Sequence, residues 1–138
     1  MPGFGLLGET GAFKANLLNL RQRRQEIIAS NVANAETPGY KARRFNFEDA
    51  LKEAMPEPGM MPMARTRSGH MPLALDMATV GEVQEVEATT PKADGNSVEL
   101  EQEMGRQTAN QLLYNYAAQS LGTQIKLMQS VIQGGTGG

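Results

Sequence analysis

The longest uninterrupted helical pattern of the chain is residues 96–133, which read NSVELEQEMGRQTANQLLYNYAAQSLGTQIKLMQSVIQ. Ten positions follow one another at alternating steps of four and three residues, and eight of these ten are apolar. Such strict spacing favours a coiled-coil seam over the wider stripe of a globular helix. Asn96 is the expected N-cap, and Glu99 three residues later completes a capping box. The row consists of Leu100, Met104, Gln107, Gln111, Tyr114, Ala118, Leu121, Ile125, Met128 and Ile132.

A second helical pattern occupies the N-terminal part of the chain, from Gly11 to about Ala35. Pro38 stops it, because the residue before a proline is driven out of the α region. Two long helices with apolar rows predict a mainly α fold, in which the N- and C-terminal helices pair as a coiled coil. The apolar row of the first helix contains Phe13, Leu17, Leu20 and Ile27.

The middle of the chain differs in kind from the two helical ends. Residues 56–72 hold four prolines and show no period, which predicts an irregular, flexible loop. Residues 73–90 have room for one or two short strands. The expected organisation is a helix and its following turn over residues 1–40, a flexible middle over 41–93 and a coiled-coil helix over 94–138. The first and third parts are expected to form one structural unit.

The composition excludes most kinds of chemical site. The 138 residues include no cysteine and one histidine, His70, so a disulfide, a thiolate metal site and a metal site of several histidines are excluded. No Gly-rich phosphate loop precedes a helix. We therefore expect no enzyme activity, no cofactor, no metal and no small-molecule substrate. No stretch approaches the ~20 apolar residues of a membrane span, and the N-terminus lacks the pattern of a cleaved secretory signal.

The formal net charge of −2 is the sum of two opposed blocks. Residues 14–44 carry seven basic and two acidic side chains, a net charge of +5, whereas residues 76–103 carry one basic and eight acidic side chains, a net charge of −7. The acidic block would repel phosphate, so we expect no nucleic-acid partner. Head-to-tail contacts between subunits would use both blocks, and two solvated faces would explain them equally well.

One motif follows the end of the N-terminal helix. Residues 29–41 read ASNVANAETPGYK. An ordinary helix stop explains Pro38 and Gly39, but it does not explain two asparagines repeated on the helix row. The motif resembles the N-terminal signature of the bacterial flagellar axial proteins, the family of rod, hook and hook-associated proteins. The matching positions are Asn31, Val32, Ala33, Asn34, Thr37, Pro38, Gly39 and Tyr40.

The resemblance implies a structural role in the flagellum. The chain has no room for the larger middle domain of hook and distal-rod members, and its C-terminal helix resembles that of the smallest rod proteins. The implied role is a subunit of the proximal rod of the basal body, which polymerises through its terminal helices into part of the periplasmic drive shaft for motility. The implied partners are other rod subunits, the ring-to-rod junction protein, the membrane-embedded ring and the flagellar type III export apparatus, which exports such subunits without a cleaved signal peptide.

Two further expectations concern individual residues. An assembly seam is expected from Leu17, Leu20 and Ile27 together with the eight apolar members of the C-terminal row. Phe13 and Leu17 have the spacing of a segment that the export gate reads in this family, although core packing explains Phe13 equally well. The rival interpretation is a coiled-coil adaptor or chaperone outside the flagellar axis, which explains the helices but not the motif.

Overall fold

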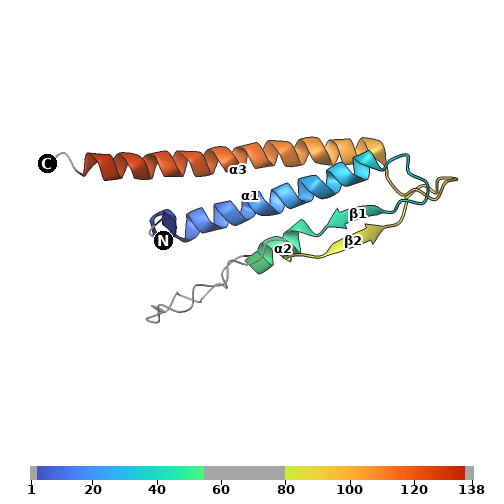
Figure 1. Cartoon of the computed structure of the whole chain (residues 1–138), viewed down its shortest axis with the longest axis horizontal. Helices are drawn as coiled ribbons and strands as arrows, with labels where there is room; N and C mark the ends of the chain where they lie inside the picture. The colour runs from blue at the N-terminus through green and yellow to red at the C-terminus, as the bar shows by residue number, and fades with distance from the viewer. Residues whose placement is uncertain (1–2, 55–79, 136–138) are drawn as a thin grey trace.

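The computed structural model describes residues 3–54 and 80–135. Two long helices lie side by side along most of the molecule, and a short helix with a two-stranded sheet covers the opposite side of the first helix (Figure 1). This arrangement confirms the mainly α fold with paired terminal helices and a short-stranded middle. The elements are α1 (Gly3–Ala33), β1 (Ala42–Phe45), α2 (Phe47–Ala54), β2 (Val83–Val86) and α3 (Leu100–Gly134).

The two long helices end where local backbone chemistry stops them. Gly8 has a positive φ of 61° and separates a short N-terminal piece from the rest of α1. The expected capping box at the start of α3 is wrong: the helix begins at Leu100, and Glu99 occupies the cap position without a side-chain capping bond. Asn96 does not cap this helix because its side chain is used in contacts with the segment that follows α1, described below.

The middle segment contains two short strands, which were expected in this part of the chain, and one short helix, which was not. Strands β1 and β2 are antiparallel, with Ala42 opposite Val86 and Phe45 opposite Val83. Helix α2 follows β1 directly, and the Oδ1 atom of Asn46 accepts a hydrogen bond from the backbone N–H of Asp49 at 3.5 Å. The loop expected at residues 56–72, with His70, lies outside the described residues.

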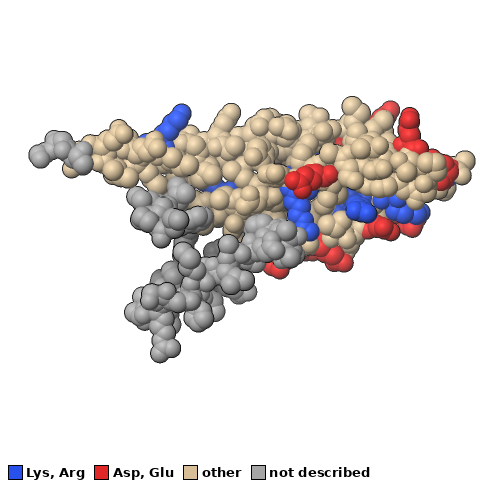
Figure 2. Space-filling model, in the orientation of Figure 1, with Lys and Arg blue, Asp and Glu red and all other residues tan. Residues whose placement is uncertain are grey.

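Charged side chains are unevenly distributed along the molecule. Acidic and basic side chains gather near the end where α3 begins, whereas the opposite half of α3 is almost free of charge (Figure 2). From residue 107 to residue 134 the only charged residue is Lys126. A long helix half with so few charges is typical of a surface that other protein covers.

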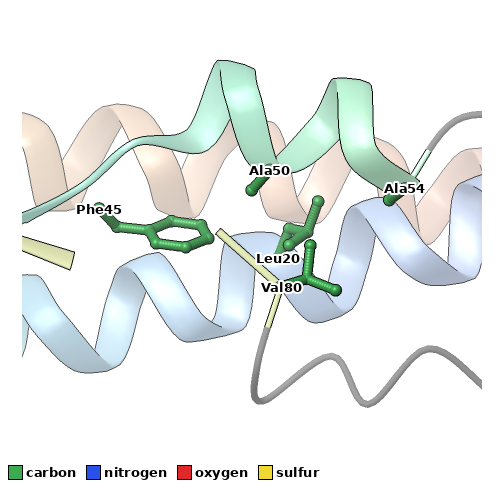
Figure 3. Packing of buried hydrophobic residues seen from close by; sticks show 5 residues of the cluster. All are labelled: Leu20, Phe45, Ala50, Ala54 and Val80. Carbon is green, nitrogen blue, oxygen red and sulfur yellow. The ribbon is translucent and has the colours of Figure 1, made fainter. Parts of the chain in front are cut away.

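The buried apolar cluster lies between α1 and the layer formed by β1, α2 and β2. Its side chains converge from α1, β1, α2 and the segment before β2 (Figure 3). Leu20 and Ala50 are fully buried. The cluster therefore fixes α1 to the middle segment, while the pairing of α1 with α3 relies on other contacts. Its members are Leu20, Phe45, Ala50, Ala54 and Val80.

A glycine beside this cluster gives the first testable prediction. Gly81 has a positive φ of 80°, and a Cβ atom there would lie 2.5 Å from the Cβ of Ala50 and 2.6 Å from the Cε2 of Phe45. Gly81→Ala should therefore lower the free energy of unfolding by about 3 kcal/mol, through backbone strain and overpacking together. Urea unfolding followed by circular dichroism measures this loss.

The matched control for this prediction is Gly39→Ala. Gly39 has a similar φ of 72°, but a Cβ atom there would meet no other atom within 4 Å. Only the backbone strain of about 1–2 kcal/mol should remain. Equal losses in the two variants would contradict the packing explanation.

Candidate functional site

The segment after α1 and the segment before α3 contact each other at one end of the helix pair (Figure 1). We call this region the joint, and it comprises residues 30–43 and 94–103. The backbone N–H of Gly39 donates to the carbonyl of Asp94 at 2.8 Å, and the N–H of Ser97 donates to the carbonyl of Tyr40 at 3.0 Å. The hydroxyl of Ser97 accepts a hydrogen bond from the N–H of Ala42 at 2.7 Å. The joint thus connects the segment that follows α1 to the segment that precedes α3 through the backbone.

Asn31 is the most highly connected side chain of the joint, and it is fully buried. Its Nδ2 atom donates to the carbonyl of Arg43 at 2.7 Å and to Oε2 of Glu103 at 3.1 Å. Its Oδ1 atom accepts from the N–H of Arg43 at 2.9 Å and from the hydroxyl of Tyr40 at 3.3 Å. One amide therefore holds the last turn of α1, strand β1 and helix α3 together, with its full hydrogen-bonding capacity in use.

The second asparagine of the motif closes the end of α1. The Nδ2 atom of Asn34 donates to the carbonyl of Ser30 at 2.8 Å, and its Oδ1 atom accepts from the hydroxyl of Thr37 at 3.1 Å. The carbonyls of Asn34 and Thr37 both accept from Nδ2 of Asn96, at 2.8 Å and 2.7 Å. Oδ1 of Asn96 accepts in turn from the N–H of Val98 at 2.7 Å. The turn after α1 is therefore held by an asparagine that lies about sixty residues later in the chain.

The remaining motif residues lie around this network. The ring of Tyr40 is half-buried, and its hydroxyl lies 3.2 Å from the hydroxyl of Ser30. Gly39 adopts a positive φ that lets the chain turn back toward the segment before α3. Val32 is half-buried, and Ala33 and Pro38 are exposed. The structure thus brings Asn31, Asn34 and Tyr40 into one network and leaves Ala33 and Pro38 on its outer side.

The row of α3 that faces α1 is shifted from the predicted apolar row. Glu103, Asn110 and Ala117 are buried, and each precedes a position of the predicted row by one residue. Nδ2 of Asn110 donates to the carbonyl of Arg21 at 2.9 Å and to Oε1 of Gln25 at 3.0 Å. Polar contacts therefore set the rotation of α3 against α1.

The residues of the predicted assembly seam fall into three groups by their burial. Leu20 belongs to the buried cluster, and seven seam residues are half-buried or lie at the edge of the contact between the helices. These seven are Leu17, Ile27, Tyr114, Ala118, Leu121, Met128 and, at 37% exposure, Ile125. Leu100, Met104 and Ile132 are exposed. Phe13, the other residue of the proposed export segment, is half-buried.

Comparison with known proteins identifies the family. The family described as flagella basal body rod protein matches residues 15–41, which cover most of α1 and the motif. The flagellar basal body rod protein FlgB of Salmonella typhimurium is 38% identical over 127 residues, which cover 89% of this chain and 92% of the relative. FlgB of Escherichia coli is 35% identical over 127 residues, with the same coverage. FlgB of Proteus mirabilis is 31% identical over 134 residues, which cover 94% of this chain and 97% of the relative.

The chain belongs to the FlgB family of flagellar basal body rod proteins. It is accordingly a structural subunit of the basal body rod and is located in the flagellar basal body. The resemblance to axial proteins that the motif indicated is confirmed. The FlgB relatives give no support to the rival interpretation as an adaptor or chaperone.

The electrostatic environment of this FlgB family member is dominated by arginines beside the joint. The carboxylate of Glu103 is buried, and its Oε1 atom accepts from Nη1 of Arg106 at 2.5 Å. Burial lowers the pKa of Arg24, and the positive charges of Arg106 and Arg44 lower it further. These guanidinium groups stay charged at any physiological pH. The charge of Glu103 is therefore shared among more than one cation.

Over residues 3–54 and 80–135, no three histidine, aspartate or glutamate side chains lie together as ligands for a metal ion. None of the helices in these ranges combines the length and the apolar content that a membrane crossing requires.

Proposed function

We propose that this subunit polymerises through its terminal helices to build the proximal part of the rod, as part of the periplasmic drive shaft for motility. The joint supports this proposal because it fixes the C-terminal end of α1 to the start of α3 through buried hydrogen bonds. A subunit that transmits torque needs such a rigid connection between the helices that contact its neighbours.

The observation that carries the proposal is the exposed apolar surface of α3. Large side chains lie in water on both flanks of the row that faces α1, and contiguous apolar patches of this kind mark interaction sites. Burial of one such side chain contributes about 1.5–3 kcal/mol. Neighbouring subunits would provide that burial. The exposed residues are Leu100, Met104, Leu112, Leu113, Tyr116, Ile125, Leu127, Val131 and Ile132.

The partners follow from the same role. The neighbours of this subunit are other rod subunits, the ring-to-rod junction protein and the membrane-embedded ring, and the flagellar type III apparatus exports it to the periplasm without a cleaved signal. Phe13 and Leu17 form the segment that the export gate reads. The subunit acts by assembly rather than catalysis, with no cofactor, metal, small-molecule substrate or nucleic acid. The names of its relatives, all basal body rod proteins, support this proposal.

Deletion of the coding sequence in the source bacterium tests the proposed function. The deletion strain should be non-motile, and its isolated basal bodies should lack the rod in electron micrographs. Expression of the full chain in the same strain should restore both the rod and motility. A motile deletion strain would contradict the proposal. Intact rods in a non-motile deletion strain would also contradict it, because the chain would then be required for the export of other flagellar proteins and not for the rod.

A further inference from the structure

An open groove lies between the N-terminal part of α1 and the C-terminal half of α3. Its volume is about 620 Å³. Tyr116 and Leu127, which are 73% and 66% exposed, stand at its two ends on α3. They are about three helical turns apart, or ~16 Å, so the groove has the length of a short stretch of helix. Its lining consists of Thr10, Lys14, Tyr116, Gln119, Ser120, Thr123, Gln124 and Leu127.

One row of α3 along this groove has small side chains between two large ones. Its members follow one another at steps of four, three and four residues, so they lie on one side of the helix. The small members leave room for side chains of a third helix, because ridges of one helix pack into such spaces on another. We call this row the groove row. It consists of Tyr116, Ser120, Thr123 and Leu127.

The other flank of α3 carries the complementary pattern. Tyr116 precedes the buried Ala117 and Ala118 follows it, and at about 100° per residue these two neighbours lie on opposite flanks of the helix. The row that begins at Ala118 starts with two small residues and continues with two isoleucines that are 37% and 53% exposed. A Cβ atom added at Gly122 would meet no described atom within 4 Å, so open space lies beside it. This row, the ridge row, consists of Ala118, Gly122, Ile125, Gln129 and Ile132.

A contact between these two rows buries no ion pair. From residue 107 to residue 134 the only charged residue is Lys126, and this half of α3 shows few charged side chains (Figure 2). Lys126 lies nine residues after Ala117, which is two and a half turns and therefore the face opposite α1. Of the described residues that line the groove, only Lys14 is charged. Its long stem can cover apolar surface while its ammonium group stays in water.

We propose that the groove row of one copy of this chain receives the ridge row of a second copy that lies beside it. This inference rests on the proposed rod function and adds the lateral contact between copies. The sizes of the side chains select the occupant. With the two α3 helices parallel and at nearly the same height, Tyr116 of one copy fills the space beside Gly122 of the other. Ile125 of the other copy then enters the gap at Ser120 and Thr123.

The same side chains fix the height of one copy relative to the next. In this arrangement Leu127 lies opposite the flexible side chain of Gln129. A shift of one helical turn would instead bring Leu127 against Ile125 or Ile132, so that two large side chains would compete for one space. Because the two rows differ and lie on opposite flanks, the contact is heterologous, and its repetition closes a ring or builds a helix.

Disulfide cross-linking in assembled rods tests this contact directly. The chain contains no cysteine, so every disulfide must come from introduced residues. The deletion strain should express a variant with Tyr116→Cys and Gly122→Cys. After mild oxidation, its isolated basal bodies should yield disulfide-linked oligomers of this chain on non-reducing gels. The two cysteines cannot pair within one chain, because six residues of helix separate them by ~9 Å, whereas a disulfide needs Cα atoms within about 7 Å.

Three controls make the cross-link specific. Each single variant, Tyr116→Cys or Gly122→Cys, should yield no oligomer, because identical residues do not meet in a heterologous contact. The pair Tyr116→Cys with Lys126→Cys should also yield none, because Lys126 lies near the same height but on the outer face of α3.

Exchange of side-chain size provides an independent readout. Gly122→Leu fills the space that receives Tyr116 and should abolish swimming, and Tyr116→Ala in the same chain should restore it in part. The purified Gly122→Leu variant should keep or gain helicity by circular dichroism, because the space beside Gly122 is open and leucine favours a helix more than glycine does. Thr89→Leu, at an exposed position between β2 and α3, is the control and should swim normally.

A photo-crosslinker identifies the occupant even if the cysteine pair prevents assembly. With p-benzoylphenylalanine in place of Tyr116, illuminated basal bodies should yield a covalent product whose peptides come only from this chain. The inference would be overturned by a product with a different flagellar subunit, by oligomers from either single cysteine variant, or by assembled double-cysteine rods without a cross-link. Normal swimming of Gly122→Leu would also overturn it. Restoration of rods by the unaltered chain separates these outcomes from a failure of the proposed function.

Discussion

Replacement of Asn31 by leucine lowers the free energy of unfolding by about 4 kcal/mol, because several buried polar groups lose their partners at once. The N–H and carbonyl of Arg43 and the Oε2 atom of Glu103 each bond this amide. Leucine has the same number of side-chain heavy atoms in a similar branched arrangement, although it is bulkier, and it offers no hydrogen bond, so these groups are left without a partner where water has poor access. Urea unfolding of the purified chain, followed by circular dichroism, measures the loss.

Two further variants make this prediction specific. Asn19→Leu places the same substitution on the exposed face of α1, and its unfolding free energy should change by less than about 0.5 kcal/mol.

Asn31→Asp instead places a second carboxyl group beside Glu103. Burial and that neighbour would raise the pKa of the new carboxyl group in the folded state, so the folded state binds the extra proton more tightly. The loss in this variant should therefore shrink as the pH falls from 7 toward 4. The hydrogen-bond network would be contradicted if Asn31→Leu and Asn19→Leu lowered the free energy of unfolding equally. It would also be contradicted if the loss in Asn31→Asp did not depend on pH.

The sequence identified the residues of the joint but not their partners. Asn31 and Asn34 are conspicuous because polar side chains interrupt a helical row just before Pro38. The hydrogen-bond partners of these two asparagines could not be predicted from the helical row in which they lie. Glu103 lies 72 residues after Asn31, and Asn96 lies 62 residues after Asn34. Local spacing carries no information on such pairs, which form only when the C-terminal end of α1 packs beside the start of α3.

The rotation of α3 could not be predicted for a different reason. A helical row of apolar residues is normally taken as the face that is buried inside the molecule. Here the row that faces α1 includes Glu103 and Asn110, because α1 presents polar groups at those heights. In a subunit built to assemble, apolar spacing reports contacts with other chains as well as contacts within the chain. The same spacing therefore predicted the helix correctly, but the face that contacts α1 lies one residue before the predicted row.

The short helix α2 was missed although its signals are present. Asn46 precedes it and Asp49 follows three residues later, which is a helix-start pattern. Ala50 and Ala54 lie one turn apart and are both buried against α1. Eight residues are too few for a periodic pattern to stand out from a loop, and the small alanine side chains give a weak apolar signal. The contact with Leu20 and Val80, which no local pattern reveals, stabilises this helix.

Replacement of Ile125 by aspartate should abolish rod assembly and motility while the subunit itself stays folded. Ile125 lies at the edge of the contact between α1 and α3 and is 37% exposed, so the substitution removes part of its packing within one chain as well as its contact with neighbouring subunits. In the assembled rod the same position would bury a carboxylate, at a cost of about 3 kcal/mol or more and hence at least roughly 100-fold in association.

Leu127→Asp, at a side chain that is 66% exposed, should have the same effect with still less influence on the fold. Thr89→Asp, at an exposed position in the segment between β2 and α3, introduces the same charge away from α3 and is the control that should leave motility intact. Circular dichroism checks the fold, secretion of the variant into the medium checks export, and swimming in soft agar checks assembly. Normal swimming of both apolar variants would show that the exposed side of α3 is not an assembly surface, whereas loss of helicity in Leu127→Asp would show that this side already packs within the single chain.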